Sequence, residues 1–229
     1  MRWEISILIA AAAVAAGQAP NGLGIGETMK RNADVLRHYS YKRRTEITIK
    51  GQTRGARTDL VRYVDGKMET VSLGAPGGPD PSTRRRGLRG KIAESKIEQK
   101  KEEMKAERER LEELLHSYLS PGSDAMRALL AKAAVSRIGP GPDADVKVVA
   151  TGLKNPTDSL SLVWSVASHR PVSIELQSQL DGKPVRLVLE YASLKDGAFY
   201  AARTLISMPK KDTVIRIDRF DYSMSGEAR

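Results

Sequence analysis

The chain has 229 residues, of which 40% are hydrophobic and 29% are charged, and it contains no cysteine. This composition is ordinary for a globular protein, so it argues against a largely disordered chain and against one dominated by membrane spans. The lack of cysteine excludes disulfide bonds, a lipid-modified N-terminal cysteine and a cysteine nucleophile.

The formal net charge is +10, and it is unevenly distributed along the chain. Residues 30–62 hold ten Lys or Arg against three Asp or Glu, whereas residues 160–222 hold nine against seven. Basic clusters attract polyanions without reading their sequence. The excess of basic residues therefore lies in the N-terminal half of the chain.

Residues 1–19 have the layout of a secretory signal peptide. Arg2 precedes an apolar run from Ile5 to Ala16, and small residues follow it. The run is too short for a transmembrane helix, which needs about 20 apolar residues. We expect cleavage after Ala15, Gly17 or Ala19 and export to the periplasm, with a buried N-terminal helix as the alternative. Residues 20–229 are then expected to form a single domain.

The N-terminal half predicts one helix followed by antiparallel strands. Glu27–Tyr39 fits a short amphipathic helix. Strands are predicted across Thr45–Lys50, Leu60–Val64 and Met68–Leu73. The dipeptide Asp65-Gly66 between the last two is a strong hairpin signal, because both residues tolerate a positive φ.

A long charged helical insertion is predicted across about residues 84–135. Its main part, Lys91–Leu115, has no Gly or Pro and is rich in Glu, Lys and Ala. Apolar residues recur there every seven positions, but Lys101 and Arg108 occupy complementary heptad positions, so the seam is only half apolar. This pattern favours a helix on a sheet edge, or one projecting from the body of a monomer, over a coiled-coil dimer. The heptad residues are Ile97, Met104, Leu111 and Tyr118.

Ser120-Pro121-Gly122 is expected to end the long helix, and a second helix is predicted across residues 123–135. Ser123-Asp124 would cap this second helix. Its inward residues would be Met126, Leu129, Leu130 and Ala133.

The C-terminal part, residues 160–222, reads as a β-meander with one apolar face. Asp181-Gly182 marks one of its turns. The predicted strands are Ser159–Val166, Val172–Leu180, Val185–Tyr191, Tyr200–Met208 and Thr213–Met224. In the last strand, Ile215 and Ile217 differ in parity from Phe220 and Tyr222. A β-bulge near Asp218-Arg219 would place all four on the apolar face.

Turn spacing in this region resembles that of the periplasmic LolA-like superfamily, which includes outer-membrane lipoprotein carriers and RseB-type sensors. The residues that carry the resemblance are Trp164, Arg170-Pro171-Val172, Asp181-Gly182-Lys183-Pro184-Val185, Tyr191, Gly197, Tyr200, Arg203 and Asp221-Tyr222. The resemblance implies an α+β fold with a curved antiparallel half-barrel sheet. We expect this sheet to curve around the N-terminal helix and the 123–135 helix.

The same resemblance implies a binding protein for lipid, lipoprotein acyl chains or another amphiphile in the sheet concavity. The alternative is an envelope-sensing or protein-interaction module of RseB type with a solid core and an envelope protein as partner. A filled sheet would favour the second interpretation. The candidate lipid-binding residues are Leu162, Trp164, Ile174, Leu176, Leu187, Leu189 and Tyr191.

Two basic clusters are candidate contacts for anionic lipid head groups on a membrane surface. For the cluster of Arg84, Arg85 and Arg86, a solvated helix entrance and a nucleic-acid patch are the alternatives. Only 5% of residues are aromatic, which leaves few rings for stacking on bases, so we expect no nucleic-acid partner. The candidates are Arg43 and Arg44, and Arg84, Arg85 and Arg86.

No catalytic or metal-binding pattern stands out. His38, His116 and His169 are far apart in sequence, and none forms a helix-face ligand pair. There is no Gly-x-Ser-x-Gly motif. We expect a protein without cofactor or enzymatic activity, and an unrecognised hydrolase is the weaker alternative.

Overall fold

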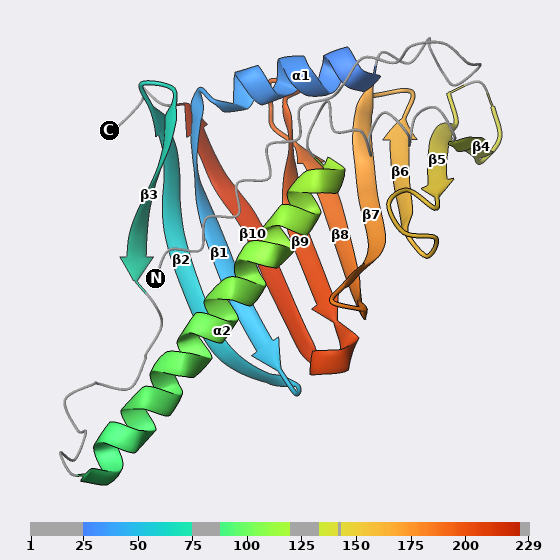
Figure 1. The fold of residues 1–229 in the computed structure, drawn as a ribbon. Helices are drawn as coiled ribbons and strands as arrows, with labels where there is room; N and C mark the ends of the chain where they lie inside the picture. The colour runs from blue at the N-terminus through green and yellow to red at the C-terminus, as the bar shows by residue number, and fades with distance from the viewer. Residues whose placement is uncertain (1–24, 75–87, 120–132, 142, 225–229) are drawn as a thin grey trace.

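A computed structural model of the chain describes residues 25–74, 88–119, 133–141 and 143–224. In it, one curved antiparallel sheet is accompanied by two α-helices (Figure 1). The helices are α1 (Ile25–Leu36) and α2 (Leu88–Leu119), and a short 3-10 helix, η2, covers Pro209–Lys211. The strands are β1 (Tyr39–Ile49), β2 (Gln52–Val64), β3 (Lys67–Gly74), β4 (Ala134–Ile138), β5 (Asp145–Thr151), β6 (Ser159–Ser165), β7 (Arg170–Leu180), β8 (Lys183–Ser193), β9 (Phe199–Met208) and β10 (Thr213–Met224).

The sheet contains ten strands in the order β3-β2-β1-β10-β9-β8-β7-β6-β5-β4. Sequence neighbours pair as hairpins on each side, and the pairing of β1 with β10 joins the two halves of the chain. The outermost strands, β3 and β4, leave the sheet open. The predicted α+β class with an unclosed, curved antiparallel sheet is therefore confirmed.

Two predicted hairpin turns are confirmed by their backbone angles. Asp65 and Gly66 have φ values of 51° and 72°, and Asp181 and Gly182 have 52° and 69°. Positive φ at both central residues defines the tight turn whose twist matches that of the flanking strands. These turns fix the registers of β2 with β3 and of β7 with β8.

The predicted 123–135 helix is wrong where the structure tests it. Ala134 and Val135 lie in β4 and pair with Val149 and Val148 of β5. The β-branched residues of this segment favour the extended form once a neighbouring strand offers backbone hydrogen bonds. The remainder of the prediction, residues 123–132, lies outside the described residues.

The β-bulge predicted in the last strand exists, but at a different place. Ser40 pairs with Ser223 and Lys42 with Phe220, so two residues of β10 lie opposite Tyr41. The extra residue is Asp221 or Tyr222, and Asp221 has a φ of 52°. Because the bulge follows Phe220, that side chain stays on the outer face and is 37% exposed, contrary to the prediction.

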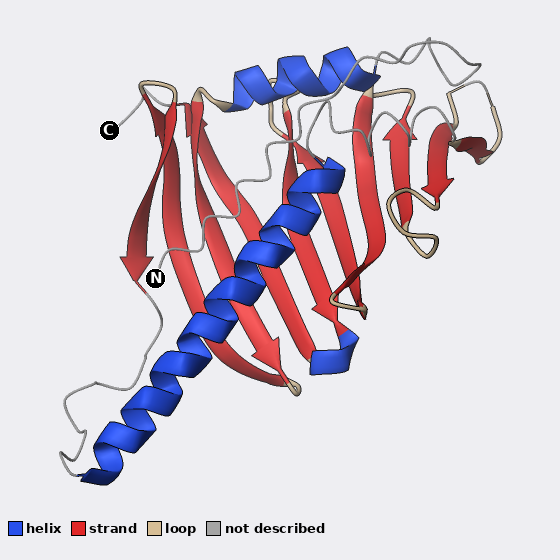
Figure 2. Ribbon diagram, viewed as in Figure 1, coloured by secondary structure: helices blue, strands red, loops and turns tan. Residues whose placement is uncertain are grey.

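The two helices lie at different places on the sheet (Figure 2). Helix α1 crosses one end of the strands, and α2 runs diagonally over the concave face. Asn32 ties α1 to β9, because its amide nitrogen donates to Phe199 O (2.6 Å) and its amide oxygen accepts from Phe199 N (2.7 Å). Beneath α1, Met29, Trp164 and Phe199 form a small buried cluster. The main core lies between the sheet and α2.

Candidate functional site

The concave face of the sheet carries two parallel rows of side chains that cross five strands. Register pairing aligns Leu162, Ile174, Leu189, Thr204 and Ile217 in one row, and Leu160, Leu176, Leu187, Ile206 and Ile215 in the next. All ten are buried, and only Thr204 is polar. Side chains alternate between the faces of a strand, so this continuous apolar surface follows from the period-two pattern of each strand.

The structure brings five of the seven candidate lipid-binding residues together in this surface and places two at its end. Leu162, Ile174, Leu176, Leu187 and Leu189 belong to the main core. Trp164 is fully buried beneath α1, and Tyr191 packs against both clusters. These side chains lie on the concave side of the sheet, as the alternation along the strands predicts. Binding of a ligand there stays a prediction.

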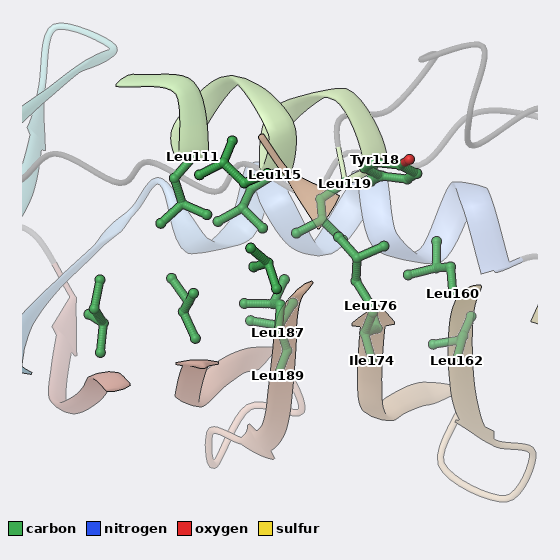
Figure 3. Close-up of a cluster of buried hydrophobic side chains, with 14 of the residues drawn as sticks. Leu111, Leu115, Tyr118, Leu119, Leu160, Leu162, Ile174, Leu176, Leu187 and Leu189 are labelled. Carbon is green, nitrogen blue, oxygen red and sulfur yellow. The ribbon is translucent and has the colours of Figure 1, made fainter. Parts of the chain in front are cut away.

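Helix α2 covers the apolar rows with the side chains of its last turns. Leu111, Leu115, Tyr118 and Leu119 are each at most 2% exposed. Their spacing of four, three and one residues forms one stripe on the helix. Figure 3 shows Leu111, Leu115 and Leu119 pointing toward the leucines of the sheet.

The C-terminal part of α2 thus lies on the concave face and not at the sheet edge that was one expectation, while its N-terminal part projects beyond the strands, which was the other (Figure 1). The heptad pattern spread the apolar residues evenly along the helix, whereas the buried residues among the described side chains all come after residue 110. Met104 is 54% exposed, although it shares the heptad position of Leu111 and Tyr118. Leu115 follows Lys101 and Arg108 in the complementary heptad series, and Leu119 lies outside both series. Together with Leu111 and Tyr118 they form the stripe that the sheet buries.

A polar network fastens the end of α2 to the sheet. The Tyr118 hydroxyl donates to Asp158 Oδ2, and Ser178 Oγ donates to Asp158 Oδ1 at 3.0 Å. The backbone amide of Asn155 also donates to Asp158 Oδ2, at 2.6 Å. Burial and the bond to Asp158 raise the pKa of Tyr118 to about 12. Burial alone would raise the pKa of Asp158, but the donated hydrogen bonds outweigh it and hold that pKa below its usual value.

One exposed and one partly buried ion pair add further contacts between α2 and the turns at the sheet end. Arg110 lies 3.3 Å from Asp181, and Lys211 pairs with Glu107. Between these turns and Glu107 remains a space of about 10 Å³, room for roughly one water molecule. The fit of α2 at this end is therefore close.

A second hollow, of about 290 Å³, lies outside the concave face, beside α1. It is lined by Thr28, Arg31, Asn32, Val35, Ser168, His169, Asp196, Gly197, Ala198 and Phe199. None of the candidate lipid-binding residues lines it.

On the β1–β2 side, the concave face becomes polar. Arg43 is 2% exposed and its Nη2 lies 3.1 Å from Asp59 Oδ2, which also accepts from Arg57 Nε at 3.0 Å. Directly across from Arg43 on β10 is Arg219. Its Nη1 donates to Ala201 O and to Thr204 Oγ1, both at 3.0 Å. We call Arg43, Arg57 and Arg219, together with Asp59, the arginine row.

Tyrosines gather next to the arginine row. The rings of Tyr41 and Tyr222 are stacked, with centroids 4.8 Å apart, and Tyr200 lies 4.2 Å from Tyr222. Burial raises the pKa of Tyr222, and nearby Arg219 partly opposes this shift. The sequence singled out Arg43 and predicted Tyr222 on this face, but it did not predict that Arg43 meets Arg57, Asp59 and Arg219 or that the tyrosines cluster. The alternation of Tyr41, Arg43 and Thr45 on one face of β1 was the only signal, and it gave no partner.

The candidate head-group arginines do not share one surface. Arg43 is buried on the concave side, whereas its neighbour Arg44 is exposed on the outer face and pairs with Glu46 at 3.2 Å. Arg84, Arg85 and Arg86 lie outside the described residues.

In the part of the chain that the structure describes, no group of three His, Asp or Glu side chains is arranged to hold a metal ion. Neither described helix is long and apolar enough to span a membrane.

Neither a known protein family nor a curated protein matches this sequence. Solved structures to which the fold is similar include a DUF1329 family protein from Desulfovibrio piger, with 10% identity, a TM-score of 0.42 and coverage of 93% of this chain and 96% of the other. A lipoprotein-sorting protein domain from Vibrio parahaemolyticus has 8% identity, a TM-score of 0.41 and coverage of 90% and 93%. A LolA superfamily protein from Nitrosomonas europaea has 10% identity, a TM-score of 0.34 and coverage of 91% and 94%.

Two of these proteins thus bear the names of the superfamily that the C-terminal turn pattern resembles. Their identities and TM-scores are low, so the likeness carries no argument about function.

Proposed function

We propose that the chain is an exported, non-enzymatic binding protein that holds lipid, lipoprotein acyl chains or another amphiphile against the concave face of its sheet. The observation that carries this proposal is the pair of buried rows across β6 to β10, which among the described residues are covered by one helix and not by a second sheet. An acyl chain matches such a surface, because burying apolar area releases about 25 cal/mol per Å² whichever apolar partner covers it.

The chemistry of α2 supports a role as a movable cover. Among the α2 side chains that the structure describes, the buried ones form one stripe near the C-terminal end, and side chains such as Glu102, Glu103 and Lys105 are exposed. An acyl chain and the side chains of Leu111, Leu115 and Leu119 would compete for the same apolar surface. Displacing the helix by cargo therefore exchanges one apolar contact for another.

A solid-core interaction module is the second candidate, and one observation favours it. The described part of α2 packs against the face that holds the candidate lipid-binding residues. A space of only about 10 Å³ remains between Glu107 and the turns at the sheet end. In that case the exposed charged face of α2 would be the recognition surface for an envelope protein.

Export and membrane contact complete the proposal. Residues 1–19 would direct the chain to the periplasm and be removed there. Arg44, together with Arg84, Arg85 and Arg86, would meet anionic head groups at a membrane surface, and the protein would act as a monomer.

Mass spectrometry of organic extracts from the natively purified protein tests the proposal. We expect an amphiphile in near-stoichiometric amount, and saturable binding of a fluorescent fatty acid after its removal. Leu189→Ala should alter that affinity, whereas Val188→Ala, the next residue on the outer face of β8, should leave it unchanged. An empty extract together with no saturable binding would eliminate the carrier and leave the interaction module.

A further inference from the structure

The arginine row is an electrostatically unfavourable arrangement within the protein alone. Arg43 and Arg219 are register partners on adjacent antiparallel strands, which places their Cβ atoms about 5 Å apart. Like charges directly opposite each other destabilise a sheet. Such a pair persists where another charge compensates it.

One carboxylate group lies among the three guanidinium groups of the row. Arg43 and Arg57 share one carboxylate oxygen of Asp59, at 3.1 and 3.0 Å. Among the described residues, the hydrogen-bond partners of Arg219 are neutral: the carbonyl of Ala201 and the hydroxyl of Thr204. Within the row, the facing charges of Arg43 and Arg219 are therefore opposed by one carboxylate, which Arg43 shares with Arg57.

Three buried polar atoms at this place have no hydrogen-bond partner among the described residues. They are Arg43 Nε, Asp59 Oδ1 and the hydroxyl oxygen of Tyr191. Tyr191 belongs to the same surface, because it lies opposite Ala201, whose carbonyl accepts from Arg219. A buried polar group without a partner costs about 1–3 kcal/mol, so each such atom calls for an explanation.

We propose that the arginine row is a binding subsite for a phosphate group. Phosphate oxygens accept hydrogen bonds from guanidinium and tyrosine hydroxyl groups, which suits Arg43 Nε and Tyr191. A phosphate monoester has a second pKa near 6, so its remaining proton can be donated to Asp59 Oδ1. Its negative charge offsets the excess charge of the row.

The position of the subsite relates it to the apolar surface. Thr204, which accepts from Arg219, stands in the same cross-strand row as Leu189 and Ile217. A phosphate held at the arginine row would thus border the surface that the proposed amphiphile occupies. This assignment rests on the proposed function. It places the anionic phosphate end of the cargo beside β1, β2 and β10 and the apolar end under α2.

Isothermal titration calorimetry with three probes tests the subsite: decyl phosphate, decyl maltoside and inorganic phosphate. We expect decyl phosphate to bind about tenfold or more tighter than decyl maltoside. Arg219→Gln should remove about that factor for decyl phosphate, as expected for one charge-assisted hydrogen bond, and should leave decyl maltoside unchanged. Arg216→Gln is the matched control, because Arg216 lies on the outer face of the same strand and pairs with Asp218.

The outcomes separate the subsite from the carrier function. Equal affinity for the two decyl compounds, or decyl phosphate binding that Arg219→Gln does not change, would overturn the subsite and leave the carrier in place. Binding of inorganic phosphate that depends on Arg219, with no added affinity from a decyl chain, would support the subsite for free phosphate and overturn the carrier. Binding of none of the probes would overturn both.

A second variant keeps the test valid if Arg219→Gln does not fold. Arg57 is 23% exposed at its side chain, so Arg57→Gln disturbs the core less. It should lower decyl phosphate affinity by a similar factor. Circular dichroism and urea unfolding of both variants establish that they are folded, and a folded Arg57→Gln protein with parental decyl phosphate affinity would count against the subsite.

Discussion

Substitution of Leu115 by alanine distinguishes a movable cover from a permanent part of the core. Leu115 is 1% exposed and lies in the middle of the buried stripe of α2, facing the leucines of β7 and β8 (Figure 3). Leucine-to-alanine changes at such positions cost about 2–5 kcal/mol. If α2 can leave the sheet while the sheet stays folded, the substitution destabilises the closed state, in which α2 is packed on the sheet, and leaves the open state unchanged.

The expected change in opening is large enough to measure. Because about 1.4 kcal/mol corresponds to a factor of ten, the open population of α2 should rise roughly thirtyfold or more. Hydrogen–deuterium exchange followed by mass spectrometry should show faster exchange across α2, with the amides of β7 and β8 remaining protected. Met104→Ala, in an exposed position of the same helix, should change neither the exchange rate of α2 nor the protection of β7 and β8. Fatty-acid affinity of Leu115→Ala should rise, because a larger fraction of molecules is already open.

Faster exchange in α2, β7 and β8 by the same factor would refute this reasoning. It would mean that α2 leaves the sheet only when the whole domain unfolds. The apolar face would then be a solid core, and the second candidate function would gain the support that the carrier loses.

Three other predictions concern stability and processing. Asp158→Asn should lower the free energy of unfolding by about 1–3 kcal/mol at pH 7, by weakening the bonds from Tyr118 and Ser178. Since folding depresses the pKa of Asp158, its stabilising contribution is present above the unfolded pKa, near 4, and is lost as pH falls through the folded pKa. Urea titrations should therefore show the two proteins converging in acid, and a constant gap would contradict this. Leu176→Asp should abolish folding if the face is a packed core, because an unpaired buried charge is too costly; a folded variant that no longer binds fatty acid would instead indicate a hydrated cavity. N-terminal sequencing of protein from its own cell envelope should find a start between Ala16 and Pro20, and an intact Met1 would remove the export proposal.

Much of the sheet was predictable because its determinants are local. The Asp65-Gly66 and Asp181-Gly182 turns impose their registers through backbone geometry that few residue pairs adopt. Alternation in β6, β7 and β8 then assigned the leucines to one face correctly. The limits of the last strand, Thr213–Met224, were also predicted as the structure has them.

What sequence reasoning missed depends on distant contacts. The bulge follows Phe220 because of the pairing with β1, and the pattern of β10 alone permitted an earlier position. The buried stripe of α2 is decided by where the helix crosses the sheet, which its own heptads do not reveal. Arg43 and Arg219 are 176 positions apart, and nothing in either local segment indicates that they are neighbours.

The pairing of β1 with β10 has a consequence for the order of assembly. Each half of the sheet is built from hairpins between consecutive strands, which form through short loops and are fast. The central seam joins Tyr39–Ile49 to Thr213–Met224, so it closes a loop of more than 160 residues, and such non-local pairings are slow. Until the last strand emerges during synthesis or translocation, β1 and β9 both present unpaired edges, which are the usual sites of aggregation. Because β10 also carries Arg219, the arginine row is complete only when β10 has paired with β1 and β9 and covered their edges.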